Sequence, residues 1–222
     1  MSQRCEEAYR TSVAGANSGE WSGAASAGVP GHFADNEFAM LESVVARGIR
    51  YGTIFADPPW FEQGAGKVKR GADRHYPIMK TSAIVAMGEV VQQLAKPNSH
   101  LYLWATNNHL PGALEVMEAW GFRYVTMVTW MKDGGPGLGQ YFRGVTEQIL
   151  FGVRGKPSYR LTRSGKRAQG LTGFTVPRGR HSEKPALPYQ WAWKVSRGPY
   201  LELFGIGERP GWRVWGNGIW EE

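Results

Sequence analysis

The chain has 222 residues, of which 42% are hydrophobic and 13% aromatic, and its formal net charge is +7. This composition indicates a globular protein, and the length favours one main domain. The single cysteine, Cys5, excludes an internal disulfide and a thiolate metal cluster, and the five histidines lack metal-ligand spacing. The chain has no apolar run of transmembrane length and no signal-peptide core, so we expect a cytoplasmic protein without a membrane partner.

Residues 1–31 are rich in Ser, Gly and Ala without apolar periodicity, which predicts a flexible arm before a domain at 32–222. The domain begins with a helix and then an apolar strand that ends at Asp57. The elements predicted next are a helix at 81–95, a strand at 100–106, a helix at 111–120, strands at 122–130 and 147–153, a helix at 186–196 and a strand at 200–204. This alternation predicts an α/β fold with a doubly wound, mainly parallel sheet, which binds ligands at the carboxyl ends of its strands.

The sequence Asp57-Pro58-Pro59-Trp60 directly follows the first predicted strand. The two prolines fix their own φ angles and offer no N–H, so the turn is rigid and rich in acceptors. The exocyclic amine of adenine presents two donors that suit such a turn. Asp57 and the Pro58 carbonyl would each accept one hydrogen, and Trp60 would stack on the base. The alternative is an ordinary Asp-Pro-Pro turn with an incidental tryptophan.

Positive charge is concentrated between Arg154 and Arg180, a segment with eight Lys or Arg residues and no Asp or Glu. Such a segment indicates either contact with a phosphate backbone or a solvated loop. A second basic stretch, "KVKRGADR", lies at 67–74. The candidate nucleic-acid-binding residues in the two segments are Lys67, Lys69, Arg70, Arg160, Arg163, Lys166 and Arg167.

Three other features of the sequence have alternative interpretations. The segment "GGPGLGQ" at 134–140 contains a GxG pattern, but no helix pattern follows it, so we interpret it as a glycine-rich substrate loop. Glu202 alternates with two leucines and therefore faces either the cofactor or solvent. His75 and His181 are candidates for catalytic acids, but we interpret both as hydrogen-bonding surface histidines.

The motifs of this chain resemble those of the DPPW-type N6-adenine methyltransferases that use S-adenosylmethionine. That family includes the catalytic subunit of the messenger RNA adenosine methyltransferase and many bacterial and phage members. Besides the DPPW turn, the resemblance includes "AWGFRYVTMVTWMK", "EQILFGVRG", "HSEKP", "LELFG" and "WGN" in family order, over about residues 49–220. It implies a Rossmann-like methyltransferase fold with permuted motif order, in which the catalytic motif precedes the cofactor-binding motif.

The resemblance also implies roles for particular residues. The catalytic set is Asp57, Pro58, Pro59 and Trp60, and the cofactor-binding set is Asp57, Ser182, Lys184, Phe204, Gly205 and Asn217. Glu147, in the family-like "EQILFG", is a candidate for positioning the substrate. A turn-capping surface lysine remains the alternative for Lys184. The sequence departs from the family pattern at Ile206, where arginine is common, and at Gly218, where an amide is common, which implies rearranged or weakened ribose binding.

These features predict an enzyme that transfers a methyl group from S-adenosylmethionine to N6 of adenine in nucleic acid, with DNA favoured over RNA. The target base would leave its stack to enter the site. The sequence leaves three alternatives open: methylation of RNA adenine, methylation of the cytosine N4 amine, and a catalytically silent nucleic-acid-binding scaffold. It also leaves open whether the chain forms a homodimer or binds a partner subunit.

Overall fold

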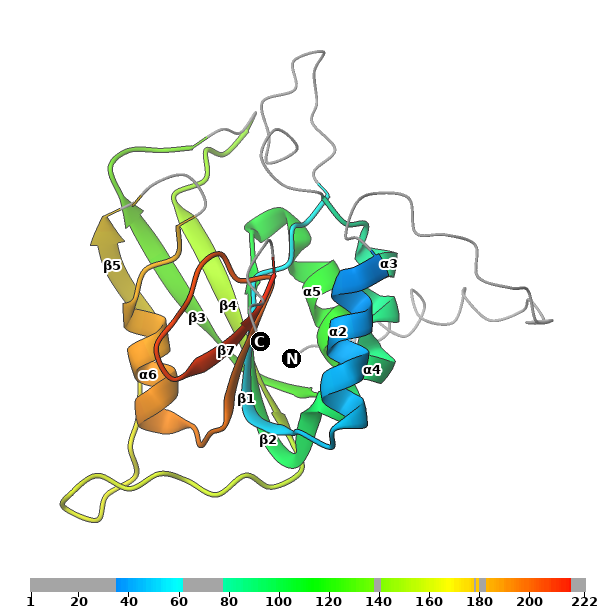
Figure 1. Ribbon diagram of the computed structural model, residues 1–222. Helices are drawn as coiled ribbons and strands as arrows, with labels where there is room; N and C mark the ends of the chain where they lie inside the picture. The colour runs from blue at the N-terminus through cyan, green and yellow to red at the C-terminus, as the bar shows by residue number, and fades with distance from the viewer. Residues whose placement is uncertain (1–34, 62–77, 138–140, 178, 180–182, 217–222) are drawn as a thin grey trace, which may run out of the picture. The chain divides into compact units, whose positions relative to one another are not determined.

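The computed structural model describes residues 35–61, 78–137, 141–177, 179 and 183–216. They contain one seven-stranded sheet with the order β5-β3-β4-β2-β1-β6-β7 (Figure 1). The strands are β1 (Tyr51–Ala56), β2 (Ala95–Ala105), β3 (Arg123–Asp133), β4 (Thr146–Arg154), β5 (Gly173–Pro177), β6 (Tyr200–Leu203) and β7 (Trp212–Trp215). The helices are α2 (Asp35–Ala46), α3 (Thr81–Ala86), α4 (Gly88–Leu94), α5 (Leu110–Ala119) and α6 (Leu187–Val195), with a 3-10 turn, η2 (Asn107–His109). The predicted N-terminal arm lies outside the described residues.

The sheet is mainly parallel, as predicted. Strand β4 is antiparallel to its neighbours β2 and β3, whereas the other four pairings are parallel. All strands except β4 therefore run in the same direction. We call the edge at which they end the carboxyl edge and the opposite edge the amino edge. Among the described residues, no helix reaches both the length and the apolar character that a membrane crossing requires.

Helices cover both faces of the sheet, which confirms the doubly wound class (Figure 1). Because side chains alternate along a strand, Ile54 and Ala56 of β1 pack in one apolar layer with α2, α4 and α5. Phe55 points the other way, into an aromatic layer with Tyr189 of α6. Its ring stacks on Tyr189 at 4.3 Å and on Tyr102 of β2 at 5.0 Å between ring centroids. The first strand is thus buried on both faces, as its continuous apolar run requires.

The structure corrects the predicted elements in two respects. Strands β5 and β7 were not predicted, because β5 alternates between exposed and half-buried residues and β7 has only four residues. The helix predicted at 81–95 is two helices that meet at Met87. The second helix begins at Gly88, which packs closely against α5: a Cβ atom there would lie 2.6 Å from the carbonyl oxygen of Ala119.

Candidate active site

The DPPW turn leaves the carboxyl edge directly after β1 and is closed by backbone hydrogen bonds. The Trp60 N–H donates to the Pro58 carbonyl at 2.9 Å, and the Met79 N–H donates to the Pro59 carbonyl at 2.7 Å. The Asp57 N–H donates to Leu203 of the neighbouring strand β6 at 3.2 Å. The turn is therefore as fixed as its two prolines suggested. Each proline carbonyl already accepts one hydrogen bond, and a carbonyl oxygen has a second lone pair for another donor.

Trp60 is part of the core and is only 7% exposed. Its indole N–H donates to the Trp104 carbonyl at 3.0 Å, and its ring stacks on His109 with 5.5 Å between ring centroids. His109 is itself bonded to Thr106 through Nδ1 and to the Phe61 carbonyl through Nε2. In this conformation His109 therefore occupies a face of the Trp60 ring, and a base cannot stack there as predicted. Trp60 instead fixes the turn that carries Asp57.

Four charged side chains form an alternating network at the carboxyl edge. The Lys184 ammonium lies 2.7 Å from Oδ2 of Asp57 and 3.7 Å from Oε2 of Glu147. The other oxygen of Glu147 bonds the Lys132 ammonium near the end of β3. Glu147 reaches this edge because it lies near the start of β4, the antiparallel strand. The structure thus links Asp57 to Lys184 and Glu147, two candidate residues from the sequence, and to Lys132, which ends one of the family-like motifs.

Burial and charge act in opposite directions on this network. Burial raises the pKa of the Asp57 carboxyl above its ordinary value, and the adjacent Lys184 ammonium opposes this rise. For Lys184, burial alone lowers the pKa, but the carboxylates of Asp57 and Glu147 outweigh it and raise the pKa above its ordinary value. Lys184 therefore remains a cation. Oδ1 of Asp57 receives no hydrogen bond from the described residues and the side chain is 25% exposed, so this oxygen can accept a donor from a ligand.

Glu202 faces neither of the surroundings predicted for it. The residue is 5% exposed, and its two carboxylate oxygens accept hydrogen bonds at 2.7 Å from the Tyr189 hydroxyl and the Arg209 Nε. The Arg209 guanidinium also lies 3.5 Å from the centre of the Tyr189 ring. These contacts fasten the segment after β6 to α6. Burial, and then the Glu202 charge, raise the pKa of the Tyr189 hydroxyl, which therefore stays protonated and donates.

The predicted cofactor residues Phe204 and Gly205 shape the backbone at the ends of β6 and β7. Phe204 has φ = 63°, in the left-handed region that side chains rarely adopt, and its ring packs against Trp215. The Gly205 N–H donates to the Trp215 carbonyl at 3.0 Å, and a Cβ atom on Gly205 would lie 2.3 Å from Val214. Both residues thus bring the ends of β6 and β7 together. Such local backbone strain clusters at functional sites.

Two predicted cofactor residues, Ser182 and Asn217, lie outside the described residues, as does Gly218. Trp104, which the sequence did not single out, is 1% exposed beneath the network. Its ring lies 5.4 Å from the Lys184 ammonium, and its buried indole Nε1 has no hydrogen-bond partner among the described residues. A tryptophan next to the end of a predicted strand was the available signal. The edge therefore offers a cation and an open carboxylate oxygen, which suit a zwitterionic ligand such as S-adenosylmethionine.

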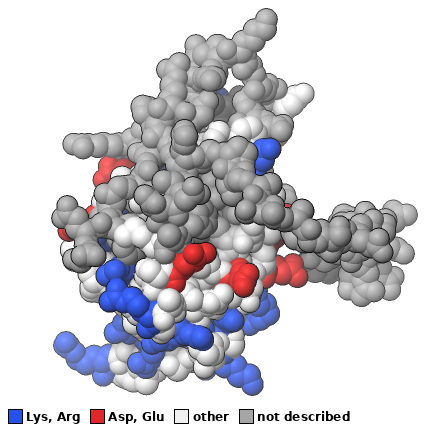
Figure 2. Space-filling view, turned by 45° about the vertical axis from the view of Figure 1, so that its right-hand side comes forward, with Lys and Arg blue, Asp and Glu red and all other residues white. Residues whose placement is uncertain are grey.

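The basic residues described in the predicted nucleic-acid-binding set lie at the other edge of the sheet. Arg160, Arg163, Lys166 and Arg167 belong to the segment that joins β4 to β5 at the amino edge. Figure 2 shows Lys and Arg side chains gathered at the lower end, where Figure 1 places this segment. The Arg160 guanidinium is engaged by the Trp193 carbonyl and the Tyr200 hydroxyl. Lys67, Lys69 and Arg70 lie outside the described residues.

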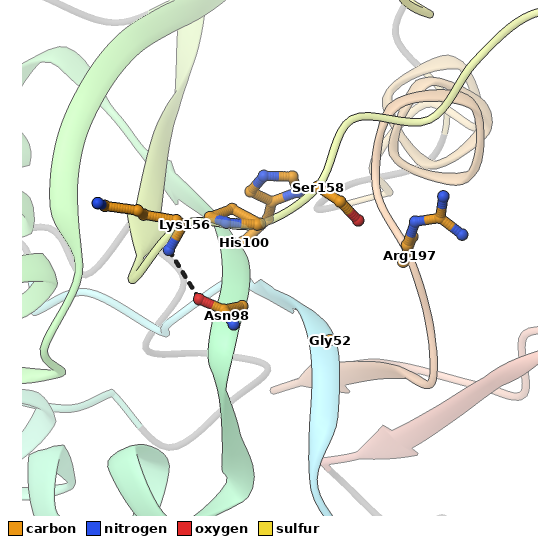
Figure 3. Close-up of a pocket in the computed structure, with 7 residues that line it drawn as sticks. Gly52, Asn98, His100, Lys156, Ser158 and Arg197 are labelled. Atoms are coloured by element: carbon orange, nitrogen blue, oxygen red, sulfur yellow. Dashed lines mark hydrogen bonds between the residues drawn. The ribbon is translucent and has the colours of Figure 1, made fainter.

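A cavity of ≈ 160 Å³ also lies at the amino edge, away from Asp57 (Figure 3). Its lining includes Gly52 at the start of β1, His100 in β2 and Arg197 after α6. His100 bonds the Ser196 hydroxyl through Nδ1 at 2.8 Å, and burial lowers its pKa to about 4, so the ring is neutral near pH 7. Because no residue of the charged network lines this cavity, it is not part of the candidate active site.

Comparisons with known proteins identify the family of the chain. The MT-A70 family model matches residues 51–218. The chain belongs to the MT-A70 family. It is similar to the type II methyltransferase M.MunI of Mycoplasma sp, with 25% identity over 75% of this chain and 77% of that protein. It is also similar to the N(6)-adenine-specific methyltransferase METTL4 of Homo sapiens, with 28% identity over 76% of this chain but only 37% of that protein. The family and enzyme class expected from the motifs, an adenine N6 methyltransferase, are confirmed.

The contact between Arg209 and Glu202 predicts a measurable loss of stability. Arg209→Met should lower the free energy of unfolding by about 1–3 kcal/mol, because it leaves a buried carboxylate oxygen unpaired. Adding Glu202→Gln should recover part of that loss, since a neutral amide oxygen still accepts the Tyr189 hydroxyl. Denaturant unfolding of both variants measures this. A double variant that is less stable than Arg209→Met would contradict the assignment.

Proposed function

We propose that this MT-A70 protein transfers the methyl group of S-adenosylmethionine to the exocyclic N6 amine of adenine in DNA. The observation that carries the proposal is the state of Asp57. One carboxylate oxygen is fixed by Lys184 at 2.7 Å, and the other has no donor among the described residues. A fixed acceptor on a rigid turn at the carboxyl edge is what a planar amine requires. The two named relatives, both methyltransferases, support the same reaction class.

The residues of this chain would act mainly by positioning the amine. One amine hydrogen would be donated to Oδ1 of Asp57, and the other to the remaining lone pair of the Pro58 carbonyl. Both bonds draw the nitrogen lone pair out of conjugation with the ring and direct it towards the methyl group. When bound, S-adenosylmethionine supplies that methyl group as an electrophile. The raised pKa of Asp57 suits it to take the proton that the methylated nitrogen must lose.

The charged network would also hold the cofactor. Lys184 is a donor for a carboxylate, and Glu147 supplies negative charge for an ammonium. Ser182 and Asn217 remain predicted contacts. Ile206 is 58% exposed at the position where the family commonly has arginine. The nearest arginine in sequence, Arg209, is already engaged by Glu202 and Tyr189, so we expect few contacts to the ribose from this segment.

The alternatives from the sequence differ in how well the site supports them. The acceptor on Asp57 suits the amine of adenine and of cytosine equally, and either polymer can present it. A silent scaffold would have no use for a buried ion pair that leaves one carboxylate oxygen open, since such pairs contribute little net stability. The adenine-specific relative favours adenine, and the type II methyltransferase favours an active enzyme over a scaffold.

Substitution of Asp57 tests the proposed function directly. Asp57→Asn keeps the shape of the side chain but removes its charge and presents an amide N–H in place of one oxygen. The rate of methyl transfer to DNA should fall by about 10²–10³-fold, the size of effect that follows loss of one preorganised hydrogen-bond partner in an active site. Glu208→Gln, an exposed acid near the same edge, is the control and should retain the wild-type rate. A wild-type rate for Asp57→Asn would refute the mechanism.

The pKa of Asp57 predicts the acid limb of the pH profile. Because burial raises this pKa, the rate at saturating substrates should rise with pH along a limb that lies above pH 3.8, the ordinary value for the group. Lys184→Gln removes the cation that opposes the rise, so the limb should move to higher pH. Lys132→Gln removes a cation bonded to Glu147 instead, and should move the limb less. A limb that moves to lower pH in Lys184→Gln would contradict the account.

Arg163 and Lys166 are proposed to contact phosphate groups at the amino edge, remote from the chemistry. Both residues are exposed, and their side-chain charges have no ion-pair partner among the described residues. Each phosphate contact contributes about 0.9 to the slope of log affinity against log salt, so Arg163→Gln/Lys166→Gln should reduce that slope by about 2. The charge-conserving Arg163→Lys/Lys166→Arg should retain it. An unchanged slope in the neutral variant would remove these contacts from the proposal.

A further inference from the structure

Two aromatic side chains at the carboxyl edge are almost fully exposed. Tyr141 is 92% exposed and Phe142 is 93% exposed, whereas Leu171, the next most exposed large apolar residue described, is 68% exposed. Burial of a Phe or Tyr side chain gains more free energy than burial of most other side chains. Two adjacent rings that remain in solvent therefore require an explanation. Neither ring has an aromatic or cation–π contact with another described residue.

The segment that carries these rings is braced at its base. The Lys132 N–H donates to the Val145 carbonyl at 2.8 Å, and the Gly137 N–H donates to the Gly144 carbonyl at 2.7 Å. Arg143, directly after the rings, folds back to donate from its guanidinium to the carbonyls of Gly137 and Pro136. We call residues 134–137 and 141–145 the β3–β4 hairpin. Its bonds hold the backbone beside the rings and leave the rings themselves projecting.

The β3–β4 hairpin begins beside the charged network. Strand β3 ends just after Lys132, which bonds Glu147 of β4. Glu147 in turn lies 3.7 Å from Lys184, and Lys184 bonds Asp57. The rings therefore project from the same edge that holds the acceptor for the amine. At that edge Trp60 is closed by His109 and cannot serve as a stacking surface in this conformation.

The composition of the hairpin favours nucleic-acid bases over a protein as its partner. Apart from the two rings, the described residues of the hairpin are glycine, proline, one arginine and the half-buried Val145. A stable protein interface buries about 800 Å² on each partner, and two aromatic side chains supply only about half of that. An unstacked base needs only one aromatic face to stack on, and this stacking does not depend on the base sequence.

We propose that Tyr141 and Phe142 stack on the bases next to the target adenine and stabilise the duplex from which the target has been withdrawn. This inference rests on the proposed function and adds the element that opens the substrate. Enzymes that modify a base inside a duplex must extrude it, and the cost of unstacking is lowest for a base that is already unpaired. The contribution of the rings should therefore depend on the pairing state of the target.

The test compares Tyr141→Ala/Phe142→Ala with the ring-conserving Tyr141→Phe/Phe142→Tyr, and uses Leu171→Ala as a control at the other edge. Methyl transfer is measured on a matched duplex and on the same duplex with the target adenine unpaired. The alanine variant should lose about tenfold or more in kcat/KM on the matched duplex and much less on the unpaired one. The ring-conserving variant and Leu171→Ala should match the wild type on both.

A fluorescence measurement reports on withdrawal of the target base independently of methyl transfer. With 2-aminopurine at the target position, the wild type should raise the emission of the matched duplex, and the alanine variant should fail to do so. Equal loss on both duplexes, no loss on either, or loss of self-association measured by sedimentation would overturn the inference. Failure of the wild type to methylate any adenine would instead refute the proposed function, while the fluorescence arm would still report on the rings.

Discussion

The ion pair between Lys184 and Asp57 is the constraint on which the carboxyl edge depends. It joins the turn after β1 to a residue 127 positions later, between β5 and α6. Removing two charges from water costs more than their attraction returns unless further hydrogen bonds compensate, so such a pair defines geometry rather than stability. Glu147 and Lys132 extend the pair towards β3 and β4. The result is one carboxylate oxygen held in place by its neighbours and still open to a donor.

The fold places the candidate active site and the excess of positive charge at opposite edges of the same sheet. The charged network balances its own cations and carboxylates at the carboxyl edge, whereas the segment between β4 and β5 gives the amino edge its excess of Lys and Arg. A nucleic acid that contacts both edges would have to extend along the molecule. Affinity for phosphate groups and orientation of the amine can then be altered separately, because no described side chain takes part in both.

How far the sequence predicted this arrangement depended on the range of the interactions involved. The rigidity of the turn follows from Pro58 and Pro59 themselves, so it was predicted correctly. The burial of Trp60 depends on the Trp104 carbonyl, 44 positions away, and no local pattern indicates such a contact. The position of the basic segment depends on the direction of β4. Alternating strands and helices predicted parallel strands, and only the reversed β4 brings Glu147 to Asp57 while it sends Arg163 to the other edge.

The proposed role of Asp57 is to present an acceptor to the N6 amine of adenine in DNA. The most direct measurement incubates the protein and S-adenosylmethionine with equal amounts of DNA and RNA, digests both polymers to nucleosides and identifies the methylated products by mass spectrometry. We expect N6-methyldeoxyadenosine as the dominant product. Methylated cytidine, or methylated adenosine from the RNA alone, would contradict it.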